Sequence, residues 1–116
     1  MTVAAAIETT DDAFIGGRLL LLQPRNGHRA GLDAVLLAAA VDAEAGEHVL
    51  EAGSGTGVVS LLIARRIAGV AVVGIEIEPD LVALAAENAR RNGLAERARF
   101  VSGDVTAGVA ALRGAD

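Results

Sequence analysis

The sequence has no cysteine and very few aromatic residues. The absence of cysteine excludes disulfide bonds and thiolate metal sites. The two histidines, His28 and His48, stand too far apart to suggest a zinc site, so no metal is expected. Only Phe14 and Phe100 are aromatic, so alanine, valine, leucine and glycine must fill the core. Hydrophobic residues still make up 53% of the 116 residues, which is enough for one small domain.

The sequence also lacks any long apolar run. No stretch approaches the roughly 20 residues of a membrane-spanning helix, so no membrane association is expected. The first residues lack the basic start and apolar centre of a signal peptide, which makes the cytoplasm the expected location. The net charge of −5 has the wrong sign for a protein that holds RNA unaided. A basic cluster in the first 30 residues is either a solvated surface or a lip that touches phosphate or a ligand carboxylate. Its members are Arg18, Arg25, His28 and Arg29.

The order of apolar runs and turn signals predicts strands that alternate with helices. Such alternation indicates parallel βαβ units, with the strands in the spatial order three, two, one and ligand chemistry at their carboxyl ends. We expect a flexible tail over residues 1–12, a leader over 13–47 and an incomplete Rossmann-like domain over 48–116. The predicted strands are 19–22, 48–52, 71–76 and 98–102, and the predicted helices are 30–41, 57–68, 79–92 and 105–112.

The most informative segment is the glycine-rich loop that joins the strand at 48–52 to the helix after it. Gly53, Gly55 and Gly57 stand there as Gly-x-Gly-x-Gly. Glycine reaches left-handed backbone angles without strain and lets bare backbone approach a ligand, while the following helix directs its free amides at that ligand. A dinucleotide-binding loop would carry its third glycine three residues after the second, where Val58 stands instead. The loop therefore favours an adenine nucleoside with a carboxylate or phosphate over NAD.

Acidic residues end the next two strands. Glu76 stands about 20 residues after the glycine loop, where a carboxylate can accept hydrogen bonds from both ribose hydroxyls. Asp104 follows the strand at 98–102 and could accept a hydrogen bond from an adenine amine, or it could only cap the turn after it. A glycine loop and two acids at three consecutive strand ends make a specific signal.

These residues resemble motif I, the second-strand acid and the third-strand Asp of class I S-adenosylmethionine-dependent methyltransferases. The resemblance covers residues 48–105 and implies the Rossmann-like α/β fold of that family, with S-adenosylmethionine as the cofactor. Glu51 stands where the family has a strand-one acid, which either orients the glycine loop or approaches the methionine amine; a paired core carboxylate is the other interpretation. The implied cofactor-binding residues are Glu51, Gly53, Ser54, Gly55, Gly57, Glu76, Ile77, Asp104 and Val105.

The leader is similar to that of one subfamily, which methylates the N6 of an adenine beside the anticodon of a valine tRNA. The similarity includes Arg29 and Asp33, in a segment that closes over the cofactor in those enzymes. It implies in-line attack by the adenine amine on the sulfonium methyl. The alternatives are another methyltransferase of the Asn-Pro-Pro-Tyr group, acting on rRNA or a protein glutamine, a nucleotide-binding oxidoreductase, and a non-catalytic cofactor-binding module.

The sequence contains no Asn-Pro-Pro-(Phe/Tyr) loop, which holds the target amine in the resembled enzymes. Residues 114–116 look like the approach to a fourth strand, so the 116 residues resemble the N-terminal half of a class I domain. The catalytic residues are expected beyond Asp116, and the tRNA or other nucleic acid would be bound by the complete protein. The half-domain alone is expected to be marginally stable, self-associating and inactive toward RNA.

Overall fold

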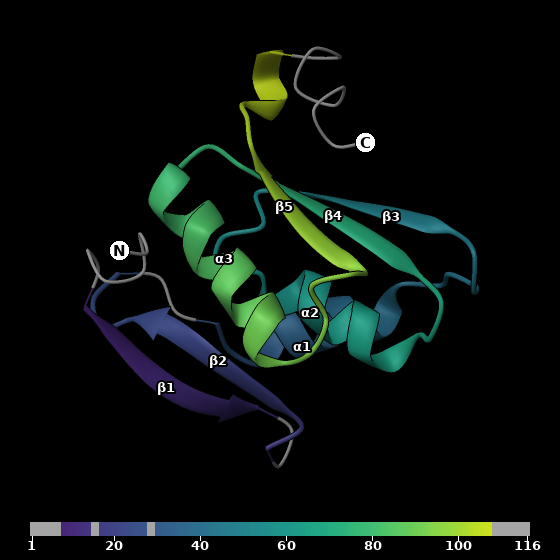
Figure 1. The fold of residues 1–116 in the computed structure, drawn as a ribbon, viewed down its shortest axis with the longest axis horizontal. Coiled ribbons are helices and arrows are strands. Elements are labelled where there is room, and N and C mark those ends of the chain that lie inside the picture. Colours follow the sequence, from purple (N-terminus) through teal and green to yellow (C-terminus); the bar gives the residue numbers. More distant parts are fainter. Residues whose placement is uncertain (1–7, 15–16, 28–29, 108–116) are drawn as a thin grey trace.

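A computed structural model describes residues 8–14, 17–27 and 30–107. Their elements form three layers: a three-stranded sheet, a layer of helices, and a hairpin on the far side of the helices (Figure 1). The strands are β1 (Thr9–Phe14), β2 (Leu19–Pro24), β3 (His48–Ala52), β4 (Ala71–Glu76) and β5 (Ala98–Ser102). The helices are α1 (Leu32–Ala40), α2 (Val58–Arg66) and α3 (Pro79–Arg91), and a 3-10 turn, η2 (Val105–Ala107), follows β5.

The three-stranded sheet is parallel, in the order β3-β4-β5. This confirms the predicted order three, two, one, and the three strands have the predicted bounds. Because parallel strands end at the same edge of a sheet, the segments that follow Ala52, Glu76 and Ser102 lie side by side. Within the described ranges, β3 pairs with β4 alone and forms one edge of the sheet.

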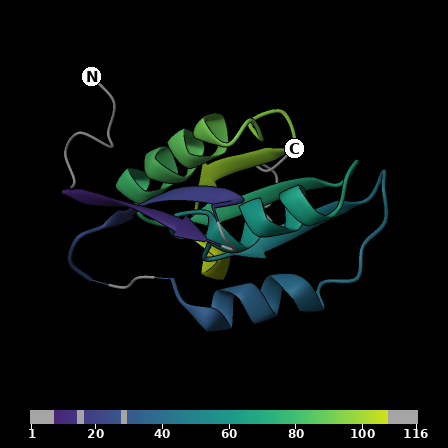
Figure 2. The ribbon, with the colours of Figure 1, turned by 90° about the horizontal axis from the view of Figure 1, so that it is seen from below.

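The helices pack on one face of the sheet and bury its apolar side chains. α2 contacts β4, α3 contacts β5 and β4, and α1 packs against α2. Figure 2 shows the three helices in the order α3, α2, α1 from top to bottom. α2 is buried from Val58 to Ala64 because the sheet, α1 and β2 surround it. On the other face of the sheet, Leu50 is 49% exposed. The self-association expected from the edge of the sheet at β3 stays a prediction.

The hairpin of β1 and β2 corrects one sequence-based boundary. Residues 9–12 were expected to belong to a flexible tail, but they form most of β1, which pairs antiparallel with β2. Thr9 and Thr10 favour a strand, but the two aspartates that follow weaken the local signal because Asp has a low strand propensity. Contacts distant in sequence hold it instead: Asp11 forms an ion pair with Arg91 of α3 at 2.7 Å. Residues 1–7 lie outside the described residues.

The remaining boundaries agree with the sequence to within a few residues. The helix expected over 30–41 is α1, the one over 57–68 is α2, and the one over 79–92 is α3. Of the last predicted helix, the structure describes η2; residues 108–116, including the expected approach to a fourth strand, lie outside the described part. No helix in the described part is long and apolar enough to cross a membrane. Nor do the described residues hold a group of metal-ligating side chains.

The ring of Phe100 fills space that two glycines leave open between sheet and helices. A Cβ added at Gly74 of β4 would lie 2.7 Å from Cδ1 of this ring, and also 2.5 Å from the Cβ of Ser54. Real Cβ atoms do not approach other atoms this closely. A single methyl group at Gly74 must therefore push the sheet, the ring or the glycine loop out of place.

We predict that Gly74→Ala lowers the free energy of unfolding by about 1–3 kcal/mol, the usual cost of an overfilled core. Gly31→Ala is the matched control. Its added Cβ would meet its nearest neighbour, Asp33 Oδ1, at an ordinary 3.6 Å, on backbone at φ −141° that alanine adopts freely. Urea unfolding followed by circular dichroism measures both variants. Equal stabilities would contradict the crowding inferred around Phe100.

Candidate functional site

The glycine loop leaves the end of β3 and is fixed to the end of β4. The N–H groups of Gly53 and Ser54 both donate to the carbonyl of Ile75, at 2.7 and 3.1 Å. Gly53 and Gly55 have φ angles of +72° and +55°, in the left-handed region that favours glycine. A Cβ added at either residue would meet no atom within 4 Å. The loop therefore presents bare backbone to open space, as the sequence predicts.

Gly57 is a glycine for a different physical reason. A Cβ added there would lie 2.8 Å from Cζ of Phe100 and 3.1 Å from the Cβ of Ala85. The missing side chain therefore makes room for the core, whereas the sequence suggested that it makes room for a ligand. Gly57 is also the N-cap of α2, with φ +90° and no side-chain cap. α2 therefore begins at the glycine loop, and no side chain caps the N–H groups of its first turn.

Glu76 holds the glycine loop from the end of β4. Its side chain is only 8% exposed, and one carboxylate oxygen accepts a hydrogen bond from the N–H of Gly55 at 2.9 Å. The other oxygen accepts from the N–H of Glu78 at 3.0 Å. A carboxylate has about four lone-pair positions, so each oxygen retains capacity for a further donor. Glu76 therefore both fixes the loop and remains able to accept from a ligand hydroxyl.

Glu51 lies on β3 directly below the loop. Its Oε1 accepts a hydrogen bond from the Ser60 hydroxyl of α2 at 2.5 Å. Burial raises the pKa of the Glu51 carboxyl above its ordinary value; the bonds from Ser60 act in the opposite direction, and the charge of Glu76 adds to the rise. The structure thus shows the paired carboxylate that was one of the sequence-based interpretations, in a position that also faces the cleft described next.

A cleft of about 410 Å³ opens beside the glycine loop, within the usual size range of small-ligand pockets. It is built from the turn after β2, the first turns of α1, the end of β3, the glycine loop and the starts of α2 and α3. Its lining includes four of the predicted site residues, Glu51, Gly53, Ser54 and Gly55, together with Asp33 of the leader. Arg29 lies outside the described residues. The other lining residues are Pro24, Asn26, Gly27, Ala30, Ala34, Leu37, Thr56, Val58, Val59 and Leu81.

A second, smaller hollow of about 120 Å³ adjoins this cleft at Gly53. It lies at the carboxyl ends of β4 and β5 and brings together four of the other five residues of that set, and the fifth, Gly57, lines neither hollow. The predicted residues that line it are Glu76, Ile77, Asp104 and Val105. Eight of the nine residues predicted from the three strand ends therefore line two adjoining hollows at one edge of the sheet.

Asp104 has a local partner in the structure. Its Oδ1 accepts from the N–H of Thr106 at 2.9 Å and from the Thr106 hydroxyl at 2.6 Å. The side-chain and backbone bonds from Thr106 lower the pKa of the Asp104 carboxyl below its ordinary value. Asp104 is thus an exposed, ionised cap of η2 that also lines the smaller hollow. The structure shows the cap interpretation, and the hydrogen bond from an adenine amine stays a prediction.

Several lining residues were not predicted from the sequence. Asn26 and Gly27 signal a turn, but nothing in their pattern shows that this turn faces the glycine loop. Leu37 and Leu81 are helical leucines whose spacing gives no sign of a cleft. A further hollow of about 260 Å³ lies between α1 and α2, beside Arg65 and away from the strand ends. None of the predicted site residues lines it, so the candidate site is the cleft at the glycine loop.

Comparison with known proteins identifies the family. Residues 43–112 match the family model described as a methyltransferase domain, which is more than half of the chain. The chain belongs to this methyltransferase family. This confirms the resemblance drawn from the glycine loop and the strand-end acids, and with it the Rossmann-like α/β fold and S-adenosylmethionine as the family's cofactor.

Two curated relatives differ in the nucleoside that they modify. The chain is 52% identical over 61 residues to the 23S rRNA (uracil(1939)-C(5))-methyltransferase of Acidithiobacillus ferrooxidans, covering 53% of this chain and 13% of that protein. It is 40% identical over 98 residues to the tRNA1(Val) (adenine(37)-N6)-methyltransferase of Porphyromonas gingivalis, covering 81% of this chain and 38% of that protein. The chain therefore spans well under half the length of these relatives.

A solved structure supports the fold. An RNA methyltransferase from Salinibacter ruber, in complex with S-adenosyl-L-homocysteine, superposes with a TM-score of 0.61 at 31% identity, over 69% of this chain and 52% of that one. A methyltransferase from Geobacter sulfurreducens, also with S-adenosyl-L-homocysteine, gives a TM-score of 0.57 at 33% identity, over 66% of this chain and 30% of that chain.

We predict that Glu51→Gln raises the thermal midpoint at pH 7, because glutamine accepts the Ser60 hydrogen bond without a buried charge. Because the pKa of Glu51 is raised in the native state, this carboxyl ionises first in the unfolded state as the pH rises. The free energy of unfolding therefore falls as the pH rises from the unfolded-state pKa to the native-state pKa. The advantage of Gln over Glu should therefore shrink as the pH falls through the native pKa of Glu51.

Thermal unfolding between pH 4 and 8 measures this difference in the unfolding midpoint. Glu47→Gln, at an exposed position, is the control. A lower midpoint for Glu51→Gln at pH 7 would contradict the burial argument.

Proposed function

We propose that this chain is the S-adenosylmethionine-binding part of a methyltransferase that modifies the N6 of an adenine in tRNA. The observation that carries the cofactor assignment is the pair of Gly55 and Glu76, joined by a 2.9 Å hydrogen bond at the junction of the two hollows. Bare backbone on one side and a carboxylate with spare acceptor capacity on the other fit a ligand that carries a ribose.

The described residues fit the two ends of the cofactor. Glu76 would accept from the ribose hydroxyls, and Asp104 from the adenine amine. Ile77 and Val105, which are 57% and 42% exposed at the smaller hollow, would contact the faces of the adenine ring. In the larger cleft, the carboxylate of Glu51 would attract the methionine ammonium group.

The leader closes the cleft from the opposite side. Asp33, on the first turn of α1, lines the larger cleft and supplies a second carboxylate there. Arg29 belongs to the same leader segment, which we propose closes over the cofactor.

The bound cofactor supplies a methyl group on a sulfonium, which is already a good leaving group, so the chain contributes alignment and exclusion of water. Because the chain holds no Asn-Pro-Pro-(Phe/Tyr) sequence, we assign none of its residues to the acceptor amine.

The leader favours tRNA over the alternatives. An alignment that covers 81% of this chain cannot be confined to residues 48–116, so the tRNA relative shares part of the leader as well. The rRNA relative is more identical but covers only 53% of the chain. Since the leader lies mostly outside the residues that match the family model, a shared leader is a stronger guide to the acceptor than the glycine loop. An rRNA substrate is the second candidate, supported by the 52% identity.

We predict that Glu76→Ala weakens the binding of S-adenosylhomocysteine by about 1–3 kcal/mol, the usual loss for charge-assisted hydrogen bonds. Isothermal calorimetry on the purified protein measures the change. Glu78→Ala is the matched control, because Glu78 is an exposed acid two residues away whose backbone, not its side chain, contacts Glu76. An unchanged dissociation constant for Glu76→Ala would mean that its carboxylate does not reach the ribose. NAD binding without any response to S-adenosylhomocysteine would overturn the cofactor assignment.

The substrate is tested by methyl transfer from labelled S-adenosylmethionine to tRNA and to rRNA, using a protein that carries this chain together with an acceptor-binding segment. We expect the label in tRNA, recovered after digestion as N6-methyladenosine. The same assay on the 116-residue polypeptide alone should give no transfer, because the chain lacks the acceptor loop. Label in rRNA alone would favour the second candidate. Transfer to RNA by the 116 residues alone would contradict the proposed division of roles.

A further inference from the structure

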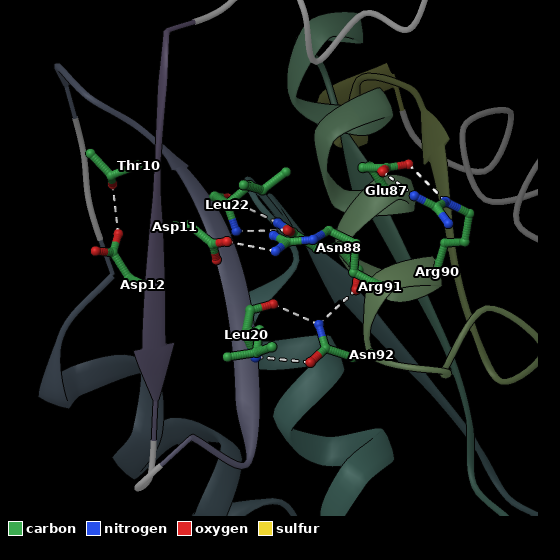
Figure 3. Close-up of polar contacts among 10 residues, drawn as sticks. All are labelled: Thr10, Asp11, Asp12, Leu20, Leu22, Glu87, Asn88, Arg90, Arg91 and Asn92. Atoms are coloured by element: carbon green, nitrogen blue, oxygen red, sulfur yellow. Dashed lines mark hydrogen bonds and ion pairs between the residues drawn. The ribbon is translucent and has the colours of Figure 1, made fainter.

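The side chains of Asn88 in α3 and of Asn92, the C-cap of α3, form hydrogen bonds with the backbone of β2. The Asn88 side chain accepts from the N–H of Leu22 at 2.7 Å and donates to its carbonyl at 3.0 Å. Asn92 forms the same pair of bonds with Leu20, at 2.8 and 2.7 Å (Figure 3). The spacing explains the match: four residues of helix rise about 6 Å, and two residues of strand rise about 6.6 Å.

Only one of the two asparagines also reaches the glycine loop. Asn88 donates through Nδ2 to the carbonyl of Thr56 at 3.0 Å, and its side chain is 0% exposed. The third contact of Asn92 goes back to the carbonyl of Asn88 within α3 itself. Asn88 therefore joins the loop to the hairpin, whereas Asn92 joins the hairpin to α3 alone.

From the hairpin, the connection continues to the opposite wall of the cleft. Gln23, the neighbour of Leu22 on β2, is 2% exposed. Its Oε1 accepts from the N–H of Ala30 at 2.7 Å, and its Nε2 donates to Asp12 of β1 at 2.9 Å. Ala30 lines the larger cleft, as does Thr56. A short chain of buried hydrogen bonds thus connects the glycine-loop wall of the cleft to its leader wall.

We propose that Asn88 is a positioning residue that holds the glycine loop and the leader wall at the separation the cofactor requires. The proposal rests on the proposed cofactor site, since Asn88 itself lines neither hollow. A ligand that contacts both walls stabilises the arrangement in which Asn88 is bonded to the loop and to β2, and Gln23 of β2 is bonded to the leader wall. By thermodynamic reciprocity, the docked hairpin then strengthens ligand binding by the same factor. Cofactor binding and hairpin docking are therefore coupled through one amide group.

The test compares Asn88→Ala with Asn92→Ala in the full chain, with S-adenosylhomocysteine as the ligand. Both variants lose two hydrogen bonds to β2, so both should have a lower thermal midpoint. Calorimetry should show at least about five-fold weaker binding for Asn88→Ala than for Asn92→Ala, the lower end of typical coupling. A purely structural role would lower both midpoints and leave the two dissociation constants alike.

Amide hydrogen exchange provides the second measurement. In the unchanged protein, the ligand should slow exchange at Leu22 and Ala30, two amides bonded within the connecting chain. This slowing should persist in Asn92→Ala and disappear in Asn88→Ala. Equal dissociation constants, or equal slowing in both variants, would overturn the proposal while leaving the cofactor site intact. No binding by the unchanged protein would instead overturn the cofactor site.

A variant at the far end of the connection keeps the test decisive if Asn88→Ala does not fold. Gln23→Met keeps the length of the side chain, removes its bonds to Ala30 and Asp12, and leaves Asn88 with all its partners. We expect weaker binding of S-adenosylhomocysteine and loss of the ligand-induced slowing at Ala30. Binding as tight as in the unchanged protein would contradict the coupling of the two walls.

Discussion

The hydrogen bond between the Gly55 amide and the Glu76 carboxylate joins the glycine loop after β3 to the end of β4, and the rest of the site depends on this junction. A carboxylate that is 8% exposed is costly to bury unless hydrogen bonds replace its water. Two backbone amides supply them, one from the glycine loop and one from the start of the segment that leads into α3. The acid of β4 thereby fixes the loop that follows β3. The loop conformation is set by the protein itself, so a ligand would not have to organise it on arrival.

The core around this pair depends on small residues. The chain has only two aromatic residues, and one of their rings, that of Phe100, packs between the sheet and the helices. Gly57 and Gly74 leave room for this ring. The glycine loop thus contains residues of two kinds. Gly53 and Gly55 face open space beside the clefts, and Gly57 faces the core. One sequence motif therefore encodes both an opening for a ligand and the packing that supports it.

Local signals explain what could be predicted from the sequence. The strands β3, β4 and β5 were predicted with their observed bounds because each is a short apolar run bounded by turn or acidic residues. The site could be predicted because parallel strands end at one edge, which places Glu51, Glu76 and Asp104 near one another without any knowledge of side-chain contacts. The cleft and hollow confirm that placement, although what each residue binds stays a prediction.

Contacts between distant residues explain what could not be predicted. β1 has a weak local signal and depends on β2 and on Arg91, which is 80 positions from Asp11. Asn88 and Leu22 are 66 positions apart, and an asparagine in a helix gives no sign that it will pair with a strand. Asn92 is the C-cap of α3, but the bonds of both asparagines to β2 cannot be seen in the sequence.

The leader lies mostly outside the residues that match the methyltransferase family model. The glycine loop and the acids of β4 and β5 belong to the part that matches the methyltransferase family as a whole. The leader lies on the other side of the cleft, and its strand β2 is bonded to Asn88 of α3, which also bonds to the loop. A wall built from a separate hairpin can change in sequence without disturbing the sheet that holds the strand-end acids. Its connection to the loop through Asn88 means that a change in the leader wall is expected to act on the cofactor cleft as well.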